Sequence, residues 1–248
     1  IGGGHAMRCL ALAEAFSAED WRCTVAARSG TLDAAPALAH AGELIELNGT
    51  VEDEPHAIGT KINACDLLVV DHYERNAAFE TASRAWAGRI VAIDDAPTRD
   101  HDCDLLVCPT PPWKADDFAP RLPATASVLA GPAYAPLRAT FADRRFAPGS
   151  RTDASAMRLL ISFGATDPAN ASARVLRTLS DSGILGAVPV DILLGSAAPH
   201  RRTVARLVAD LPSARLHIDP SDPAGIIARA SLTIGAAGTM AWERCALA

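Results

Sequence analysis

The first residues in this chain that could do chemistry are a histidine and the three glycines before it. Gly2, Gly3 and Gly4 are expected to form a turn whose backbone approaches a ligand closely, because glycine carries no side chain. Apolar residues at helical spacing predict a helix over residues 7–18. His5 would lie at the first turn of this helix and face the cleft. A neutral imidazole, with an ordinary pKa of about 6.5, can take a proton from water there. The alternative keeps His5 as a helix-start residue bonded only to the backbone.

The glycines also suggest a dinucleotide site, which the rest of the pattern opposes. In the G-x-G-x-x-G fingerprint the third glycine packs the helix on the strand, but Met7 stands at that position. The next strand ends at Arg28, whereas a dinucleotide site needs an acidic residue there for the ribose. The sequence therefore argues against NAD or NADP, and no cofactor is expected.

A second glycine turn lies in SFGATDPAN, residues 162–170. Gly164 is expected to let the backbone approach a ligand. Asp167 is the expected N-cap of the next helix and Pro168 its first residue. Asn170 could reach a substrate from the first helical turn, and a solvated side chain is the alternative.

A third segment, GAAGTMAWE at residues 235–243, is expected to start a helix after a buried strand. The free amides of Gly238, Thr239 and Met240 and the positive end of the helix dipole suit a phosphate group. Glu243 lies four residues after Thr239, on the same face of the helix. A capping box needs an acid three residues after the N-cap, where Trp242 stands, so Glu243 is not explained as a cap. Its carboxylate could accept hydrogen bonds from a vicinal diol such as ribose, or it could simply be an acid near a helix N-terminus.

Acidic and aromatic residues end two other predicted strands. Asp71 closes one strand and Tyr73 follows it in the crossing loop, while Asp94 and Asp95 close the next strand. Ligands bind outside the carboxyl ends of parallel strands, so ligand contact and loop hydrogen bonding are both open for the aspartates. Ligand contact is favoured for Tyr73. Arg8, on the first helix, could add a positive charge, and a solvated helix face is the alternative.

The elements that must position these residues alternate along the chain. Short continuous apolar runs separated by helical periodicity predict an α/β protein with parallel sheets and helices on both faces. Turn-forming residues 146–156 divide the chain near Gly149 into domains 1–149 and 150–248, and the two sheets are expected to face each other across a cleft. The predicted strands are 22–27, 66–70, 90–93, 104–107, 158–163, 190–194, 214–218 and 231–234, and the predicted helices are 7–18, 75–86, 169–180 and 200–209.

Composition narrows the class of partner. The chain has 248 residues, a net charge of −6 and no basic run, which excludes an electrostatic surface for nucleic acid. The sequence contains no run of about 18 apolar residues, so no membrane span is predicted.

The six cysteines form no CxxC pair and are expected to be reduced thiols of a cytoplasmic protein. His101, Cys103 and Cys108 lack the second close pair that a metal site needs, so no metal is expected. Oligomeric state is not predicted.

Taken in order, these segments resemble a known family. Six motifs spanning nearly the whole chain carry the resemblance: GGGHAMRCLALA, VVDHY, IVAIDDAPTRDHDCDLLV, AGPAYAPLRATF, LLISFGATDPAN and GAAGTMAWE. Together they resemble the UDP-sugar hydrolases of pseudaminic acid biosynthesis. The resemblance implies a GT-B-like fold of two Rossmann-like domains, related to nucleotide-sugar glycosyltransferases. It also implies hydrolysis of a UDP-sugar partner, UDP-2,4-diacetamido-2,4,6-trideoxy-β-L-altropyranose. Attack on the anomeric carbon by a water that His5 deprotonates would invert the configuration, and this scheme requires no metal.

The resemblance implies roles for matching residues. His5 matches a histidine that assists attack by water, and Tyr73 matches a tyrosine close to the sugar, so both are expected to be catalytic. Residues 238–240 match a helix start that holds the diphosphate, and Glu243 matches a carboxylate on the ribose. With the residue-level interpretations above, the expected substrate-binding set is Gly4, Arg8, Asp71, Asp94, Gly164, Asn170, Gly238, Thr239, Met240 and Glu243.

Two departures from the family pattern stand out. Ala165 occupies a position where a second glycine is expected, which would narrow the pocket. A strand is expected ahead of the opening glycines and a segment after Ala248, so the sequence is expected to be a trimmed piece of a longer chain. Two other functions stay open: a glycosyltransferase, whose nucleotide half would look the same, and a non-catalytic module that binds a UDP-sugar.

Overall fold

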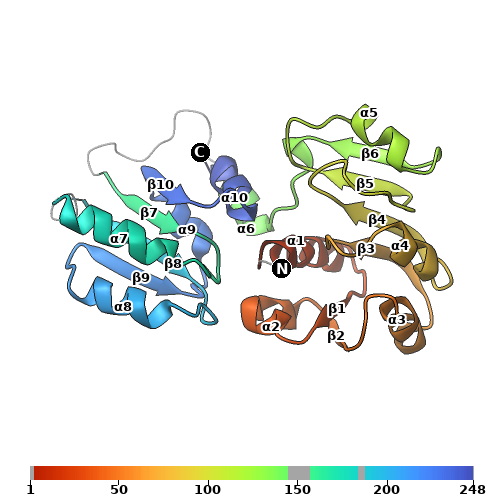
Figure 1. Cartoon of the computed structure of the whole chain (residues 1–248), viewed down its shortest axis with the longest axis horizontal. Helices are drawn as coiled ribbons and strands as arrows, with labels where there is room; N and C mark the ends of the chain where they lie inside the picture. Colours follow the sequence, from red (N-terminus) through yellow and green to blue (C-terminus); the bar gives the residue numbers. More distant parts are fainter. Residues whose placement is uncertain (1–2, 145–156, 184–187, 248) are drawn as a thin grey trace. The chain divides into compact units, whose positions relative to one another are not determined.

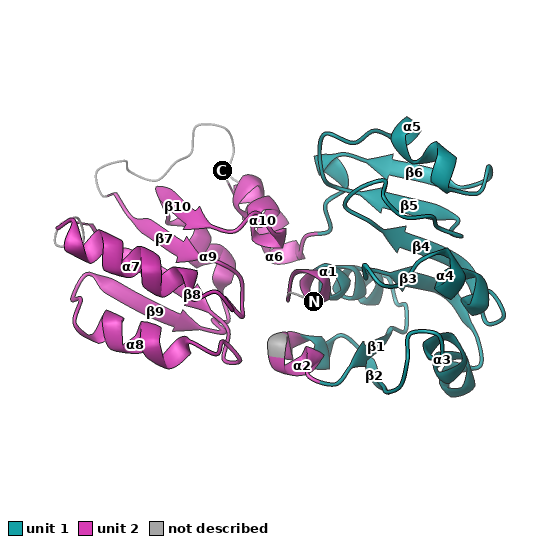
Figure 2. Cartoon of the chain, viewed as in Figure 1, with its two compact units in different colours: residues 1, 8–29, 38–136 teal, residues 2–7, 30–37, 137–248 magenta. Residues whose placement is uncertain are grey.

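The computed structural model describes residues 3–144, 157–183 and 188–247. The chain divides into two compact units (Figure 2). Unit 1 consists of the described residues in Arg8–Ser29 and Leu38–Pro136, and unit 2 of those in Gly2–Met7, Gly30–Ala37 and Leu137–Ala248. The predicted boundary near Gly149 lies outside the described residues.

The strands of unit 1 are all parallel. β1 (Thr24–Arg28) pairs with β2 (Glu43–Leu47), and β3 (Cys65–Val70), β4 (Ala87–Ile93), β5 (Leu105–Cys108) and β6 (Ser127–Ala130) form a four-stranded sheet in that order (Figure 1). Neighbouring strands of the four-stranded sheet are consecutive in the sequence. The loops at its carboxyl end therefore bring residues after Val70, Ile93 and Cys108 to one edge.

Helices cover the apolar strands of unit 1. Buried side chains of β2, β3, β4 and β5 pack with Ile58, Phe79 and Phe118 from three helices in one hydrophobic core. Leu10, from the first helix, is also buried. The helices and short 3-10 turns are α1 (Gly3–Ala18), α2 (Thr31–Ala34), η1 (Pro36–His40), α3 (Glu54–Ile62), α4 (Ala77–Ser83), α5 (Ala115–Phe118), η2 (Ala119–Arg121) and η3 (Pro132–Tyr134). Of these, α2, the start of α1 and the start of η1 are grouped with unit 2.

Unit 2 contains a second parallel sheet, with strands in the order β10-β7-β8-β9. The strands are β7 (Leu159–Ser162), β8 (Val190–Leu194), β9 (Ala214–Ile218) and β10 (Leu232–Gly235), and the helices are α6 (Ala139–Ala142), α7 (Ala171–Asp181), α8 (Arg201–Ala209), α9 (Pro223–Ala228) and α10 (Thr239–Leu247).

Alternation along the strands of unit 2 creates two cores. Ile161 and Ile192 pack with Leu176 of α7, whereas Leu160 and Leu193 pack in a separate cluster that includes residues of α6, α9 and α10. Successive strand residues point to opposite faces, so helices must cover both faces of this sheet. The α/β class with parallel sheets is therefore confirmed. No helix in the described part of the chain combines the length and apolar character needed to cross a bilayer.

Two local predictions are corrected. Gly3 and Gly4 do not form a turn before a helix, because α1 already begins at Gly3 and includes His5. α7 begins at Ala171 rather than at Pro168. Asp167 still satisfies free amides of that helix, but from a greater distance along the chain: its carboxylate accepts hydrogen bonds from the backbone N–H groups of Ala171 and Ser172 at 2.9 Å.

Candidate functional site

Polar side chains gather at the carboxyl edge of the four-stranded sheet in unit 1. Asp71 follows β3 directly, Asp95 lies two residues after β4, and Thr110 lies two residues after β5. Arg8, on α1, joins them, and Tyr73 comes from the loop between β3 and α4. We call these five residues the Asp95 cluster.

Arg8 is the centre of charge in this cluster. Its Nε and Nη2 donate to the two oxygens of Asp71 at 2.9 and 2.7 Å, and its Nη1 donates to Asp95 Oδ1 at 2.8 Å. Burial opposes the charge, but the two carboxylates raise the pKa of Arg8 above its ordinary value. The expectation of a solvated helix face is wrong, because the chain buries the guanidinium between two acids that lie more than sixty residues away in sequence.

The carboxylate of Asp95 accepts hydrogen bonds from three side chains. Beside Arg8, the hydroxyl groups of Tyr73 and Thr110 donate to it at 2.7 and 2.9 Å. Burial would raise the pKa of Asp95, but these donors and the positive charge of Arg8 hold it below its ordinary value. For Tyr73, burial and the neighbouring Asp95 carboxylate raise the pKa to about 12.

Asp94 faces a different set of partners. Its carboxylate accepts from Arg99 and contacts the Nε2 atom of His101 at 3.0 Å, while His101 Nδ1 contacts Glu80 Oε1 at 2.8 Å. Burial disfavours the imidazolium, yet the two carboxylates raise the pKa of His101 to about 9. Both ring nitrogens are therefore engaged with carboxylates, so His101 offers neither of them to a metal. No group of three metal-ligating side chains occurs among the described residues.

Arg99 fixes the loop that carries Tyr73. Its Nη1 atom donates to the backbone carbonyls of His72, Tyr73 and Arg75, and its guanidinium lies 5.6 Å from the centre of the Tyr73 ring. Because Arg99 is also paired with Asp94, the loop after β3 is tied to the residues after β4. This arrangement fixes the backbone on which the Tyr73 side chain stands.

Two expected residues at the chain's start lie in α1. Gly4 uses its backbone carbonyl to accept a hydrogen bond from Thr239 Oγ1 at 3.1 Å, and a Cβ at this position would lie 2.8 Å from that oxygen. The glycine therefore serves close approach of Thr239 and not a turn. His5, one residue on, is half-buried.

The start of α10 has open space at Gly238 and a buried acid four residues after Thr239. Among the described residues other than its chain neighbours, no atom lies within 4 Å of where a Cβ of Gly238 would be, and Met240 packs against the core. Glu243 is only 9% exposed. Burial raises the pKa of Glu243 to about 7, an effect that the charges of Arg138 and Arg244 only partly offset.

The turn before α7 also places expected residues. Gly164 has a φ of +92° and open space where its Cβ would lie, a conformation that glycine adopts at little cost. Asn170, with a φ of +52°, is half-buried, and its Oδ1 atom is buried with no hydrogen-bond partner in the described part of the chain. The solvated side chain expected as the alternative is therefore not observed.

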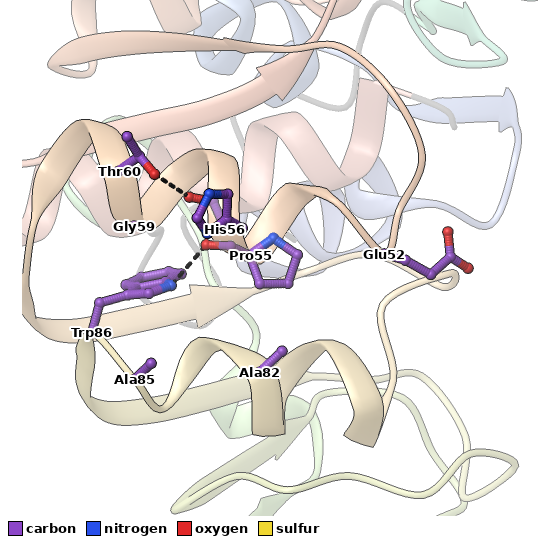
Figure 3. A pocket seen from close by; sticks show the side chains of 8 residues that line it. All are labelled: Glu52, Pro55, His56, Gly59, Thr60, Ala82, Ala85 and Trp86. Carbon is purple, nitrogen blue, oxygen red and sulfur yellow. Dashed lines mark hydrogen bonds between the residues drawn. The ribbon is translucent and has the colours of Figure 1, made fainter.

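A pocket lies elsewhere, on unit 1 between α3 and α4 (Figure 3). Its volume is about 350 Å³, and the ring of Trp86 forms part of its wall while donating to the backbone carbonyl of Pro55 at 2.8 Å. None of the expected site residues lines it. Trp86 packs so close to Gly59 that a Cβ there would lie 2.4 Å from the ring. The pocket therefore reflects how two helices pack, and the expected chemistry lies away from it.

The structure brings the expected residues together in two groups. Arg8, Asp71 and Tyr73 meet in the Asp95 cluster of unit 1, and Gly4 meets Thr239 in unit 2. Asp94 joins neither group but belongs to the neighbouring ion-pair chain. Thr110, Arg99 and Glu80 were not expected. Thr110 and Arg99 lie in predicted loops and Glu80 inside a predicted helix, and these positions carry no signal that sets them apart from their neighbours in the sequence.

Comparisons with known proteins give a distant relationship. No profile of a known protein family matches the chain. A curated UDP-2,4-diacetamido-2,4,6-trideoxy-beta-L-altropyranose hydrolase from Campylobacter jejuni subsp. jejuni is 24% identical over 247 residues, which is 98% of this chain and 83% of the hydrolase. This low identity extends over nearly the whole chain.

Two solved structures also align with the chain. The pneumococcal O-GlcNAc transferase GtfA in complex with UDP and GlcNAc is 12% identical, with a TM-score of 0.41; the match covers 71% of this chain and 38% of the transferase. The E. coli heptosyltransferase WaaC with ADP-2-deoxy-2-fluoro heptose is 16% identical, with a TM-score of 0.43, and the match covers 100% of this chain and 84% of WaaC.

Proposed function

We propose that this chain hydrolyses a UDP-sugar at the anomeric C–O bond and releases UDP and the free sugar. The observation that carries the proposal is Glu243 on α10, an acid that is only 9% exposed and whose pKa burial raises to about 7. Buried polar groups are normally hydrogen-bonded, and the hydroxyl groups of a ligand would donate hydrogen bonds to this carboxylate. The similarity to a UDP-sugar hydrolase, which extends over 98% of this chain, supports this choice of ligand and reaction.

The nucleotide is assigned to residues of unit 2. The amides at Gly238, Thr239 and Met240 precede or begin a nine-residue helix, α10, whose N-terminal dipole favours the diphosphate. Glu243 accepts hydrogen bonds from the ribose hydroxyls. Gly164 and Asn170, at the turn before α7, are assigned to the same ligand.

His5 is assigned as the base of the reaction. It takes a proton from a water molecule while the water oxygen bonds to the anomeric carbon, and the C–O bond to UDP breaks with its electron pair leaving on the diphosphate. Attack from the face opposite UDP inverts the anomeric configuration. UDP leaves without a protonating carboxylic acid, because the α10 amides stabilise its charge; glycosidases that cleave ordinary sugar linkages use a carboxylic acid instead. The scheme uses no metal, and the sugar is assigned to Tyr73, Asp71 and Arg8.

The substrate of the related hydrolase, UDP-2,4-diacetamido-2,4,6-trideoxy-β-L-altropyranose, is the first compound to test. Incubation in water labelled with heavy oxygen and without any acceptor is expected to release UDP and to place the label on the sugar. UDP-N-acetylglucosamine serves as a comparison for the sugar. A label found on the phosphate, or release of UDP that requires an added acceptor, would contradict the proposal.

Substituting His5 tests its assigned role. We expect His5→Asn to lower turnover by about 10²- to 10⁴-fold, the usual contribution of a general base, while UDP binds with unchanged affinity. His56, which is exposed on α3, provides the matched control, and His56→Asn is expected to turn over at the parent rate. Turnover of His5→Asn at the parent rate would remove His5 from the mechanism.

A further inference from the structure

Asp95 receives hydrogen bonds from three different elements of unit 1. Arg8 donates from α1 to both carboxylate oxygens, at 2.8 and 3.3 Å. Thr110 donates from the loop after β5 at 2.9 Å, and Tyr73 donates from the loop after β3 at 2.7 Å. An ionised carboxylate can only accept, and these donors hold Asp95 in its ionised form. The Tyr73 hydroxyl must therefore donate its proton to Asp95.

Tyr73 is held at its ring as well as at its hydroxyl. The Arg99 guanidinium lies over the ring, and the same side chain bonds the backbone carbonyl of Tyr73 at 2.6 Å. Even so, 51% of Tyr73 is exposed, so a ligand can reach it. With its proton directed at Asp95, the phenol can offer a ligand only the lone pairs of its oxygen.

We propose that Asp95 is a positioning residue that holds the Tyr73 proton, so that Tyr73 meets its ligand as an un-ionised hydrogen-bond acceptor and not as an acid or a base. The chemical class it accepts from is an amide N–H or a hydroxyl. That the ligand is the sugar of a UDP-sugar rests on the proposed function; the position of the proton does not.

The charges around Tyr73 agree with this geometry. Asp95 and Asp71 oppose ionisation of the phenol, whereas Arg8 favours it, and Arg99 adds a second positive charge over the ring. Burial and Asp95 have the larger effect, and they raise the pKa of Tyr73. A phenol that stays neutral across the working range of pH cannot serve as the general base.

The chain allows a direct measurement because it has two tyrosines, Tyr73 and Tyr134. In a Tyr134→Phe background, the ultraviolet absorbance of phenolate reports Tyr73 alone, and circular dichroism at each pH shows where the fold persists. We expect Tyr73 to remain un-ionised up to pH 11 in this background. Adding Asp95→Asn is expected to lower the pKa of Tyr73 by one unit or more toward its ordinary value of about 10.

The matched control is Asp104→Asn. Asp104 is also an aspartate paired with arginines, Arg84 and Arg89, but it makes no contact with the Asp95 cluster among the described contacts. This variant is expected to leave the titration of Tyr73 unchanged. The proposal is overturned if Tyr73 ionises near pH 10 in the background protein, or if Asp95→Asn and Asp104→Asn titrate alike. If Asp95→Asn does not fold, the titration of Tyr73 in the Tyr134→Phe protein still tests the proposal.

Turnover provides a second, separate measurement. When kcat/KM is plotted against pH, the parent is expected to show no decrease caused by ionisation of Tyr73. The Asp95→Asn variant is expected to lose activity as pH rises past about 10, where its Tyr73 phenol ionises. A merely structural role for Asp95 would lower activity equally at every pH and would overturn the positioning role. If no UDP-sugar is hydrolysed, the proposed function fails, but the tyrosine titration still tests the inference.

Discussion

Glu243 shows how one residue can be costly for the fold and useful for a ligand. Its side chain is buried on α10, and burial raises the pKa of its carboxyl group to about 7. Near neutral pH the unliganded fold therefore holds a carboxyl group that is close to half ionised. Under the proposed function, the hydroxyl groups of a ribose would donate hydrogen bonds to this carboxylate.

We therefore expect Glu243→Gln to stabilise the unliganded protein and to weaken UDP binding. The folded pKa lies above the ordinary value near 4.5, so stability is lost as pH rises through 7, and glutamine avoids that loss. The gain in unfolding free energy at pH 8 is expected to be as much as about 3 kcal/mol and to vanish below pH 4.5. UDP affinity is expected to fall at least tenfold, because hydrogen bonds to a charged group contribute about 1.5–3 kcal/mol.

Urea unfolding and UDP titration calorimetry measure the two effects. Glu80→Gln is the control, because Glu80 is also buried but contacts His101 and the backbone N–H of Asp102. That variant is expected to lose stability. A Glu243→Gln protein that is no more stable than the parent at pH 8, or that binds UDP as tightly, would show that the carboxylate has another role.

At the scale of elements, a chain of charges links α4 to the loop that carries Tyr73. Glu80 of α4 contacts His101, His101 contacts Asp94, and Asp94 is paired with Arg99, which bonds three carbonyls of the loop. Two carboxylates and two cations alternate along this chain, so each buried charge has a neighbour of opposite sign. Removing one member leaves its neighbours uncompensated.

His101→Asn is therefore expected to destabilise unit 1 in a pH-dependent way. The folded pKa of about 9 lies above the ordinary value of 6.5, so the stabilisation is complete below pH 6.5 and is lost as pH rises through 9. We expect a loss of about 3 kcal/mol at pH 6, shrinking by pH 9.5. Urea unfolding at the two pH values measures it, with His56→Asn as control. An equal loss at both would mean that the imidazole is not charged in the fold.

The elements show what sequence patterns capture and what they miss. The predicted bounds of β8 and β9 match the observed ones, because both strands carry apolar residues that pack in one core of unit 2. β8 is buried along its whole length, whereas no residue of the edge strand β9 is fully buried. The strand β2, with sequence ELIEL, was not predicted because glutamates interrupt it, and three of its five residues are exposed. α1 was expected to start later because the glycines were interpreted as a turn that approaches a ligand, whereas Gly4 lies in the helix and allows the close approach of Thr239.

The candidate site was predictable in part for a related reason. Asp71, Tyr73 and Asp94 were found because residues at the carboxyl ends of parallel strands share one edge of a sheet. Their hydrogen-bond partners were not predictable, because the bonds from Arg8 to Asp71 and Asp95 join residues far apart in sequence. Spacing along the chain carries no information about such pairs.

At the scale of the whole molecule, the hydrophobic cores divide as the compact units do. The cluster around Ile90 draws its residues from unit 1, and the clusters around Ile192 and Leu160 draw theirs from unit 2. Each unit therefore has its own buried apolar surface, which is the main source of favourable folding free energy. Core substitutions should act on the unit that contains them.

Two core variants and one ligand test this division. Ile90→Ala and Ile192→Ala each remove a fully buried side chain and are expected to cost about 2–5 kcal/mol. In differential scanning calorimetry Ile90→Ala should lower the transition of unit 1, and Ile192→Ala that of unit 2. UDP is assigned to unit 2, so it should raise the transition temperature of unit 2 by mass action and leave that of unit 1 unchanged.

Tryptophan fluorescence can assign the transitions, because Trp242 belongs to unit 2 and the other three tryptophans to unit 1. If both variants lower one shared transition equally, the two cores unfold as one cooperative body.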